Sequence, residues 1–222
     1  VPLSMESEFA FPRTGELIQI LKEVKALWLG RPNNPTGTMV SKGQLLELAR
    51  VFPRTWFIVD EAFIQFVEDW ERKSLIKEPP RHNILVIHSL TKFYALAGLR
   101  LGAVCGEKDV VLRLKQVKEP WTVNGISEIV AGMLLECGDY EQETDSITSR
   151  ERERTYRRLK ELDGIRVFPP SANFLLCQWR RSTHLDDLLR HLLAHGVYVR
   201  DCRNFPGLEK NFFRFGLKSP EE

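Results

Sequence analysis

The sequence is poor in the features that mark secreted, membrane-spanning and metal-binding proteins. Its four cysteines are far apart and form no C-x-x-C pair, so neither a disulfide framework nor a zinc site is indicated. No apolar run is long enough to span a bilayer, and no signal peptide is recognisable. The net charge of +2, from 32 basic and 30 acidic residues, provides no overall field that would attract nucleic acid. We therefore expect a cytoplasmic protein with no membrane or nucleic-acid partner and with reduced core thiols at Cys105, Cys137, Cys177 and Cys202.

The chain does contain enough apolar residues for sizeable cores. Of its 222 residues 43% are hydrophobic and five are Trp, which suits one large domain or two small ones. Three short apolar runs, at 26–29, 56–60 and 84–87, are typical of buried strands. A helix that Ser41 can cap, and that stops before Pro53, separates the first two. Strand-helix-strand units pair in parallel, so we predict an α/β fold with a mainly parallel sheet.

The strongest candidate for a reactive group is Lys92, in the segment SLTKFYALAGLRLG from Ser89 to Gly102. Lys92 is a lone cation among aliphatic and aromatic neighbours just after a predicted strand, and desolvation of an ammonium group favours the nucleophilic amine. The Ser89 hydroxyl and the Arg100 guanidinium lie nearby in sequence and suit a phosphate group. Taken alone, the same residues are also typical of a surface lysine and of an arginine with a carboxylate partner. If the Lys92 amine is reactive, the side chains of Ser89, Lys92 and Arg100 together could hold a phosphorylated aldehyde.

Two further strand ends carry polar side chains. The segment RPNNPTG, from Arg31 to Gly37, forces a rigid turn after a strand and fixes the amide of Asn34. The segment WFIVDEAF delivers Asp60 to the carboxyl end of the next strand, where a carboxylate suits a metal or a salt bridge. Functional residues of α/β proteins gather at such strand ends, so we expect Asn34, Asp60 and Lys92 to share one region.

The C-terminal third begins with a charged helix predicted over 139–162. Acidic and basic residues alternate in it, which favours a solvated helix with i,i+4 ion pairs over a nucleic-acid surface. Strands are predicted at 165–168, 173–179, 198–202 and 212–217, with a helix at 184–195. His191 and His195 are spaced i,i+4 on that helix, but no third ligand joins them to indicate a metal.

Arg214 lies within the aromatic strand FFRFGL, where an unpaired guanidinium would be costly. It should therefore meet an anion, which is either a buried carboxylate of the protein or a ligand.

Together, an amide, an acid and a lysine flanked by phosphate-binding groups form a pattern that resembles the fold type I pyridoxal-phosphate enzymes, the class I/II aminotransferase superfamily. The resemblance covers nearly all of residues 26–217. It implies that Lys92 carries the cofactor as a Schiff base and that Asp60 pairs with the pyridinium nitrogen. It also implies that Asn34 donates to the ring 3-hydroxyl oxygen and that Ser89 and Arg100 bind the cofactor phosphate.

The resemblance further implies a PLP-dependent transferase-like fold and a homodimer of the full-length protein. In that fold, residues 1–140 form a partial large domain with a mainly parallel sheet, 141–163 a linking helix, and 164–222 a small C-terminal α+β domain. The part of the large domain that precedes this region in relatives has no match here, so we expect a fragment that lacks roughly the first third. A non-catalytic piece of such an enzyme is the alternative to an active one.

The resemblance also implies a substrate site. Arg214 would bind the α-carboxylate of an amino acid, with Asn34, Asn173 and Arg200 facing the same substrate. If the substrate is a small phosphorylated amino acid, Arg200 and Lys210 are candidates to bind its phosphate. Phe63, in place of a tyrosine, and the segments PWTVN at 120–124 and NFPGL at 204–208 resemble family members that decarboxylate such a substrate more than those that transaminate it.

Overall fold

The computed structural model describes residues 3–219, which divide into two compact units. The larger unit comprises residues 12–32 and 40–145, and the smaller unit comprises residues 3–11, 33–39 and 146–219. The domain boundaries expected at 140 and 163 stay a prediction. Among the described residues, no helix is both long enough and apolar enough to cross a membrane.

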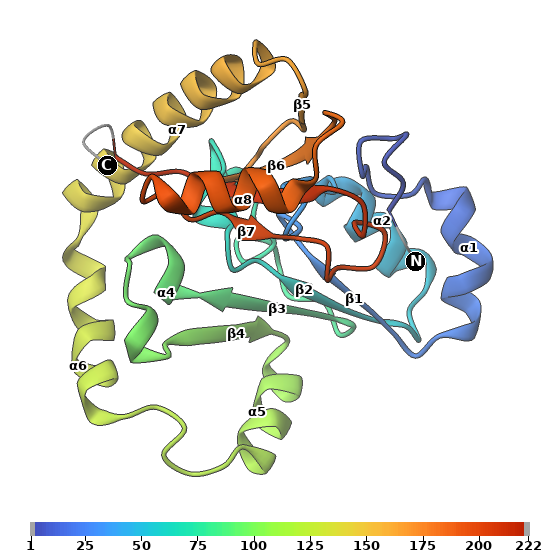
Figure 1. The fold of residues 1–222 in the computed structure, drawn as a ribbon. Helices are drawn as coiled ribbons and strands as arrows, with labels where there is room; N and C mark the ends of the chain where they lie inside the picture. Colours follow the sequence, from blue (N-terminus) through green and yellow to red (C-terminus); the bar gives the residue numbers. More distant parts are fainter. Residues whose placement is uncertain (1–2, 220–222) are drawn as a thin grey trace. The chain divides into compact units, whose positions relative to one another are not determined.

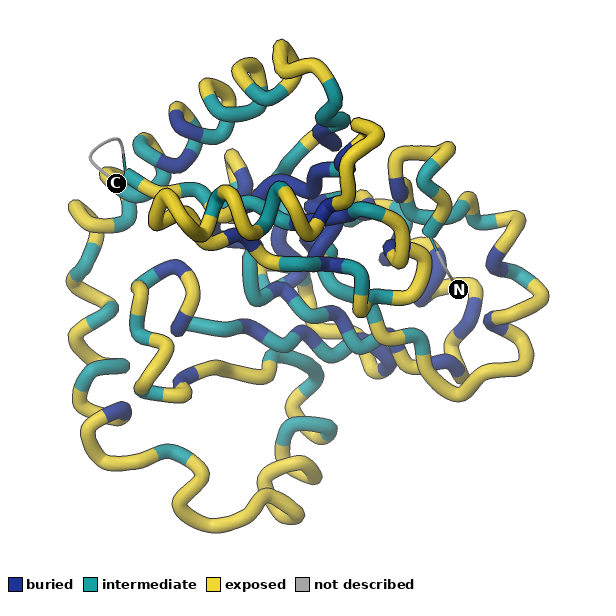
Figure 2. The backbone as a smooth tube through the Cα atoms, viewed as in Figure 1, coloured by how far each residue is buried: buried dark blue, intermediate teal, exposed yellow. Residues whose placement is uncertain are grey.

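The larger unit is built on a four-stranded sheet in the order β1-β2-β3-β4 (Figure 1). The strands are β1 (Ala26–Gly30), β2 (Trp56–Asp60), β3 (Ile84–Ser89) and β4 (Gly102–Gly106). The first three pair in parallel, and β4 runs antiparallel to β3. This arrangement confirms the predicted α/β class with a mainly parallel sheet. The side chains of Phe57, Val59 and Val86 form part of its core, and Figure 2 shows buried residues alternating with less buried ones along β2 and β3.

Helix α2 (Lys42–Val51) begins and ends close to where the sequence predicts a helix between Ser41 and Pro53. Ser41 caps α2, because its Oγ accepts a hydrogen bond of 3.1 Å from the backbone N–H of Gln44. At the other end of α2, the buried Asn83 donates to the carbonyls of Ala49 and Phe52. The helices of the larger unit are α1 (Thr14–Glu23), α2 (Lys42–Val51), α3 (Trp70–Lys73), α4 (Leu90–Phe93), α5 (Lys108–Val117) and α6 (Gly125–Met133); 3-10 turns span Ile64–Phe66, Ala97–Leu99 and Leu134–Glu136.

Strand β4 is shorter than the apolar stretch in which it lies. Residues 99–105 are mainly apolar, which favours a strand over the whole stretch, but β4 begins only at Gly102. Residues 97–99 form a 3-10 turn instead, and Arg100 takes a left-handed backbone with a φ of 54°. That conformation is incompatible with an extended strand.

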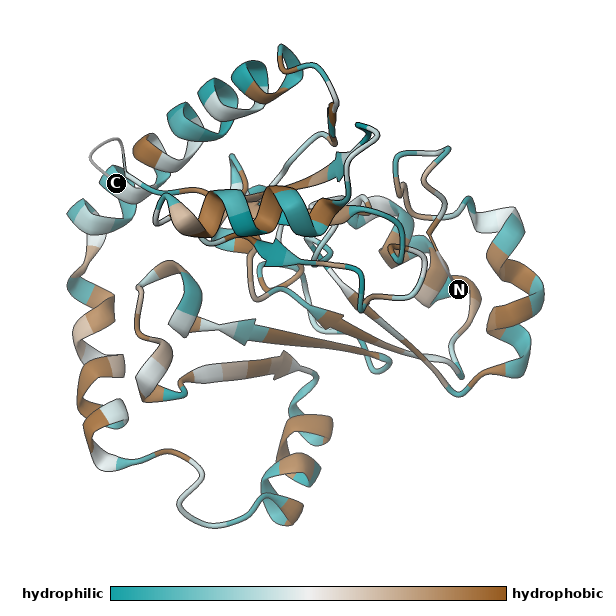
Figure 3. Ribbon diagram, in the orientation of Figure 1, coloured by the Kyte–Doolittle hydropathy of each residue, from teal (hydrophilic) through white to brown (hydrophobic). Residues whose placement is uncertain are grey.

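Helices α5 and α6 expose much of their apolar surface. None of the apolar side chains of either helix is buried, and Trp121 in the connection between them is 93% exposed. Figure 3 shows apolar residues along both helices. Apolar patches of this kind are usually covered by other polypeptide.

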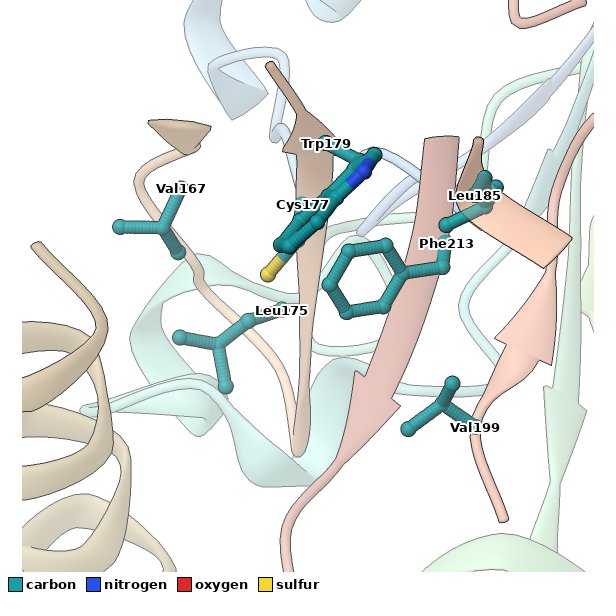
Figure 4. Close-up of a cluster of buried hydrophobic side chains, with 7 residues drawn as sticks. All are labelled: Val167, Leu175, Cys177, Trp179, Leu185, Val199 and Phe213. Atoms are coloured by element: carbon teal, nitrogen blue, oxygen red, sulfur yellow. The ribbon is translucent and has the colours of Figure 1, made fainter. Parts of the chain in front are cut away.

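The smaller unit contains an antiparallel sheet in the order β5-β6-β8-β7. Its strands are β5 (Ile165–Val167), β6 (Phe174–Trp179), β7 (Arg200–Asp201) and β8 (Phe212–Gly216), with α8 (Leu185–Ala194). One core cluster, centred on Leu175, Cys177 and Phe213, packs side chains of β6 and β8 against Leu185 of α8 (Figure 4). A strand does form within the segment predicted at 198–202, but it spans only two residues.

The charged segment forms one helix, α7 (Gly138–Lys160), as predicted. Two of its ion pairs follow helical spacing, with 2.9 Å between Arg154 Nη1 and Glu151 Oε2 and 2.5 Å between Arg157 Nε and Glu153 Oε1. The thiols differ in burial: Cys177 and Cys202 are core residues, whereas Cys105 and Cys137 are half-buried, so the expectation of core thiols is wrong for the latter two.

Replacing Leu175 with alanine should lower the free energy of unfolding by about 3 kcal/mol, because the side chain is fully buried and a cavity would remain. Urea unfolding followed by circular dichroism measures the change. Leu193→Ala on α8 is the matched control, since this leucine is 61% exposed, and it should change stability by less than about 0.5 kcal/mol. Equal losses in the two variants would contradict the core assignment.

Candidate active site

Asp60 is the last residue of β2 and lies in the middle of the parallel part of the larger sheet. The strand register places it beside Gly30 of β1 and Ile87 of β3. Its carboxylate is half-buried, and Oδ1 accepts a hydrogen bond of 3.0 Å from the backbone N–H of Ala62. Oδ2 has no hydrogen bond within the described chain, so one carboxylate oxygen remains for another donor.

Ser89 and Lys92 follow the neighbouring strand, β3. Ser89 is the N-cap of α4, and its Oγ lies 2.9 Å from Oγ1 of Thr91, so two hydroxyls sit together at this strand end. Lys92 lies on α4 and is exposed, whereas Thr91 and Phe93 take the buried positions of that short helix. The expectation that its neighbours in sequence desolvate Lys92 is therefore wrong, because Lys92 is exposed although Thr91 and Phe93 on either side of it are buried.

Arg100 follows the 3-10 turn after α4. Its side chain is exposed, and Nη1 donates a hydrogen bond of 3.2 Å to the carbonyl of Ala97. In the described chain it has no carboxylate partner, so the alternative of an arginine held by an ion pair is wrong. The guanidinium keeps donors available for an anion.

A cluster that the sequence did not reveal anchors the Lys92 segment. The hydroxyl of Tyr94 donates to the carboxylate of Glu141 and lies 3.4 Å from Nε2 of Gln65. The Tyr94 ring stacks on Tyr140, whose hydroxyl donates a hydrogen bond of 2.9 Å to the carbonyl of Phe93. Burial, and then the hydrogen bond to Glu141, raise the pKa of Tyr94 to about 12. The partners lie 47 residues apart in sequence, so no local pattern could have identified the pair.

In the smaller unit, Arg214 on β8 contacts Asn34. Arg214 Nη1 donates a hydrogen bond to Asn34 Oδ1, and the guanidinium lies 5.0 Å from the ring centre of Phe174. Burial lowers the pKa of Arg214. Within residues 3–219 no carboxylate pairs with it. The oxygen of Asn34 is engaged by Arg214, which leaves the amide Nδ2 free to donate.

Two arginines lie opposite each other in this sheet. Arg200 of β7 is the register partner of Arg214, and like charges at such positions repel. Arg200 Nη2 donates a hydrogen bond of 3.2 Å to Asn204 Oδ1, which neutralises no charge. Asn173, just before β6, has a buried Oδ1 without a hydrogen-bond partner. The smaller unit thus offers two guanidinium groups and an unsatisfied amide oxygen, a donor and acceptor set that suits an anionic ligand bearing an amine or hydroxyl.

The predicted site residues therefore form two groups. The structure brings Asp60 and Ser89 to adjacent strand ends of the larger unit, with Lys92 and Arg100 following, and it brings Asn34, Arg200 and Arg214 together in the smaller unit. The expectation that Asn34 shares a region with Asp60 and Lys92 is not tested, because Asn34 belongs to the other unit. Among the described residues, no group of three His, Cys, Asp or Glu side chains is placed to hold a metal ion.

Comparison with known proteins identifies the family. The model of aminotransferase class I and II matches residues 10–222, so the chain belongs to this family. A putative threonine-phosphate decarboxylase from Caldanaerobacter subterraneus subsp. tengcongensis is 33% identical over the whole chain, and the chain spans 61% of that protein's length.

Solved structures share the fold. A histidinol-phosphate aminotransferase from Clostridium acetobutylicum superposes with a TM-score of 0.86 and 30% identity, over 93% of this chain and 63% of that one. A histidinol-phosphate aminotransferase from Sinorhizobium meliloti, solved in complex with pyridoxal-5'-phosphate, has a TM-score of 0.78 at 21% identity, over 91% of this chain and 56% of that one. The resemblance inferred from the residues is thereby confirmed at the level of family and fold.

Replacing Tyr94 with phenylalanine should remove a pH-dependent contribution to stability. A folded-state pKa of about 12, above the usual value near 10, means that this contribution is complete below about pH 10 and is lost as the pH rises towards 12. Urea unfolding measured at several pH values in that range should show that the free energy of unfolding falls more steeply with rising pH in the parent than in Tyr94→Phe. Tyr198→Phe is the control, because Tyr198 is 80% exposed, and it should follow the parent curve. Parallel curves for the parent and Tyr94→Phe would contradict the assignment.

Proposed function

We propose that the larger unit binds pyridoxal phosphate through Asp60, Ser89, Lys92 and Arg100. The observation that supports this most is the Asp60 carboxylate at the end of the middle parallel strand, with one oxygen unengaged and a hydroxyl-bearing strand end beside it. The donor set fits the cofactor: an amine for its aldehyde, hydroxyl and guanidinium donors for its phosphate, and a carboxylate for its ring nitrogen.

Each side chain has a distinct role in this proposal. Asp60 holds a proton on the ring nitrogen, because an adjacent carboxylate favours the cationic form. Ser89 and Arg100 bind the phosphate, and Asn34 Nδ2 donates to the ring hydroxyl oxygen. The Lys92 amine would hold the cofactor through its aldehyde carbon and, as a free amine, would carry a proton to or from the substrate Cα. When bound, the cofactor supplies an electron-accepting ring that stabilises negative charge at that carbon.

We propose that the smaller unit binds the substrate. Arg214 binds the α-carboxylate, because it is half-buried and lacks an acidic partner in the described chain. Arg200, its cross-strand neighbour, binds a phosphate on the substrate, which offsets the repulsion between the two guanidinium groups. Lys210 is exposed in the turn before β8 and is a further phosphate ligand, and Asn173 accepts a hydrogen bond through its unsatisfied Oδ1.

The reaction we propose is the decarboxylation of L-threonine O-3-phosphate, a step in cobalamin biosynthesis. Phe63 and the segments 120–124 and 204–208 support it, as does the 33% identity to a putative threonine-phosphate decarboxylase. The alternative is transamination of histidinol phosphate, which the TM-score of 0.86 to such an aminotransferase favours. Both substrates are phosphorylated amines, but only threonine phosphate has a carboxylate for Arg214. We also propose that the full-length protein is a homodimer.

The chain spans about three fifths of the relative's length, so cofactor binding is the first property to measure. Adding pyridoxal phosphate should produce a visible absorption band that Lys92→Ala abolishes, because the amine that reacts with the aldehyde is gone. Lys115→Ala, a change at an exposed lysine of α5, should keep the band. A parent chain without a band would show that this polypeptide is a non-catalytic piece and would overturn the proposal.

Product analysis distinguishes the two reactions. Threonine phosphate added to the loaded protein should release CO2 and yield an amine, whereas keto-acid formation without CO2 would overturn the decarboxylase proposal. Arg214→Met should lower kcat/KM on the order of 100-fold, because a charge pair to the carboxylate is lost. Arg180→Met, at an exposed arginine outside the proposed site, is the matched control and should leave kcat/KM unchanged.

A further inference from the structure

A buried ion pair lies directly beside Asp60. Nη1 of Arg31 is 2.6 Å from Oε1 of Glu61, and the two side chains are 1% and 0% exposed. Arg31 is the first residue after β1, and Glu61 is the first residue after β2. The pair therefore joins the carboxyl ends of two adjacent parallel strands.

Each nitrogen of the Arg31 guanidinium and each oxygen of the Glu61 carboxylate has a hydrogen-bond partner within the larger unit. Arg31 also donates from Nε to the carbonyl of Val40, at 2.9 Å, and from Nη2 to the carbonyl of Lys73, at 2.8 Å. Glu61 accepts a 2.5 Å hydrogen bond from Ser74 Oγ and a 3.1 Å bond from the backbone N–H of Leu75. A saturated buried network of this kind allows only one arrangement of the groups that it joins.

The backbone extends this constraint to Asp60. The N–H of Arg31 donates to the carbonyl of Asp60 at 2.8 Å, and the N–H of Glu61 donates to the carbonyl of Ile87 at 2.8 Å. The peptide group that follows Asp60 is thus held from both neighbouring strands. Because the side chain of Glu61 is fixed in the interior, the preceding residue is held with its carboxylate half-buried and bonded to the N–H of Ala62.

Stability alone is a weak explanation for the pair. Two charges taken out of water lose hydration free energy that their attraction only partly restores, and apolar side chains of similar volume often serve a fold equally well. We propose that the Arg31–Glu61 pair is a positioning device that sets the orientation of the Asp60 carboxylate. The inference rests on the proposed role of Asp60 towards a pyridine nitrogen, and it assigns Arg31, Glu61 and Ser74 as positioning residues for that site.

The hydrogen bond from the Ala62 N–H to Asp60 Oδ1 reports this orientation without any cofactor. Amide hydrogen exchange, measured by NMR on the ligand-free 222-residue chain, compares Ala62 with Glu61, whose N–H belongs to the sheet. In Arg31→Met/Glu61→Leu, exchange at Ala62 should accelerate about 10-fold relative to residue 61. Ser74→Ala removes one hydrogen bond to Glu61 and keeps the ion pair, and it should accelerate exchange at Ala62 about 3-fold relative to Glu61. If the double variant does not fold, Ser74→Ala alone tests the positioning role.

Lys42→Met is the matched control. Lys42 also forms an ion pair in the larger unit, at 2.5 Å from Glu78, and donates to the carbonyl of Arg72, but it does not contact Glu61. This variant should leave the ratio of the Ala62 and Glu61 exchange rates unchanged. Equal acceleration at both amides in Ser74→Ala, or no acceleration at Ala62, would overturn the positioning role and leave a purely structural pair.

A second measurement separates this inference from the proposed cofactor site. Asp60→Asn should weaken binding of pyridoxal phosphate to the parent, and the same change in the Ser74→Ala background should weaken it less, because part of the contribution of Asp60 is already lost. Full additivity of the two losses would contradict the positioning role. If the parent binds no pyridoxal phosphate, the proposed function fails, whereas the exchange experiment still decides whether the ion pair orients Asp60.

Discussion

Parallel pairing of β1, β2 and β3 is the constraint on which the larger unit depends. Parallel strands end at the same edge of a sheet, so Gly30, Asp60 and the last residues of β3 reach one side together. The chain then turns sharply after each strand, and the residues at those turns carry the polar side chains. The buried Arg31–Glu61 pair joins two of these strand ends through side chains as well as through backbone hydrogen bonds. Asp60 accepts the backbone hydrogen bond from Arg31 through its carbonyl, and it directly precedes Glu61, which forms the side-chain pair.

A different constraint dominates the smaller unit. Its antiparallel sheet places Arg200 opposite Arg214, and within the described chain neither guanidinium has a carboxylate partner. Such an arrangement is unfavourable in the absence of an anion, whereas a ligand with two negative groups would relieve the repulsion. The hydrogen bond from Arg214 to Asn34 orients one guanidinium without neutralising it. The features of this unit therefore favour binding of a doubly anionic ligand over a purely structural role for the arginines.

Family membership and reaction rest on different kinds of observation. The match over residues 10–222 and the shared fold establish that the chain is a class I and II aminotransferase family member. Relatives of similar identity include a putative decarboxylase and aminotransferases, so sequence similarity does not separate the two reactions. The difference is which bond at Cα is aligned with the cofactor ring, and that alignment depends on a few contacts to the substrate. In the function proposed above, Arg200 and Arg214 would make such contacts.

Local patterns in the sequence were sufficient for most strands of the two sheets, for α2, α7 and α8, and for the strand ends that carry the candidate site. Short apolar runs, the Ser41 cap and the polar residues after each strand are short-range signals, because neighbouring residues determine turns and caps. Tertiary structure decided the rest. The partners Tyr94 and Glu141, or Arg31 and Glu61, are far apart in the chain, and only packing brings their side chains within hydrogen-bonding distance. The exposure of Lys92 was likewise decided by packing, because Thr91 and Phe93 take the buried positions of α4 and Lys92 does not.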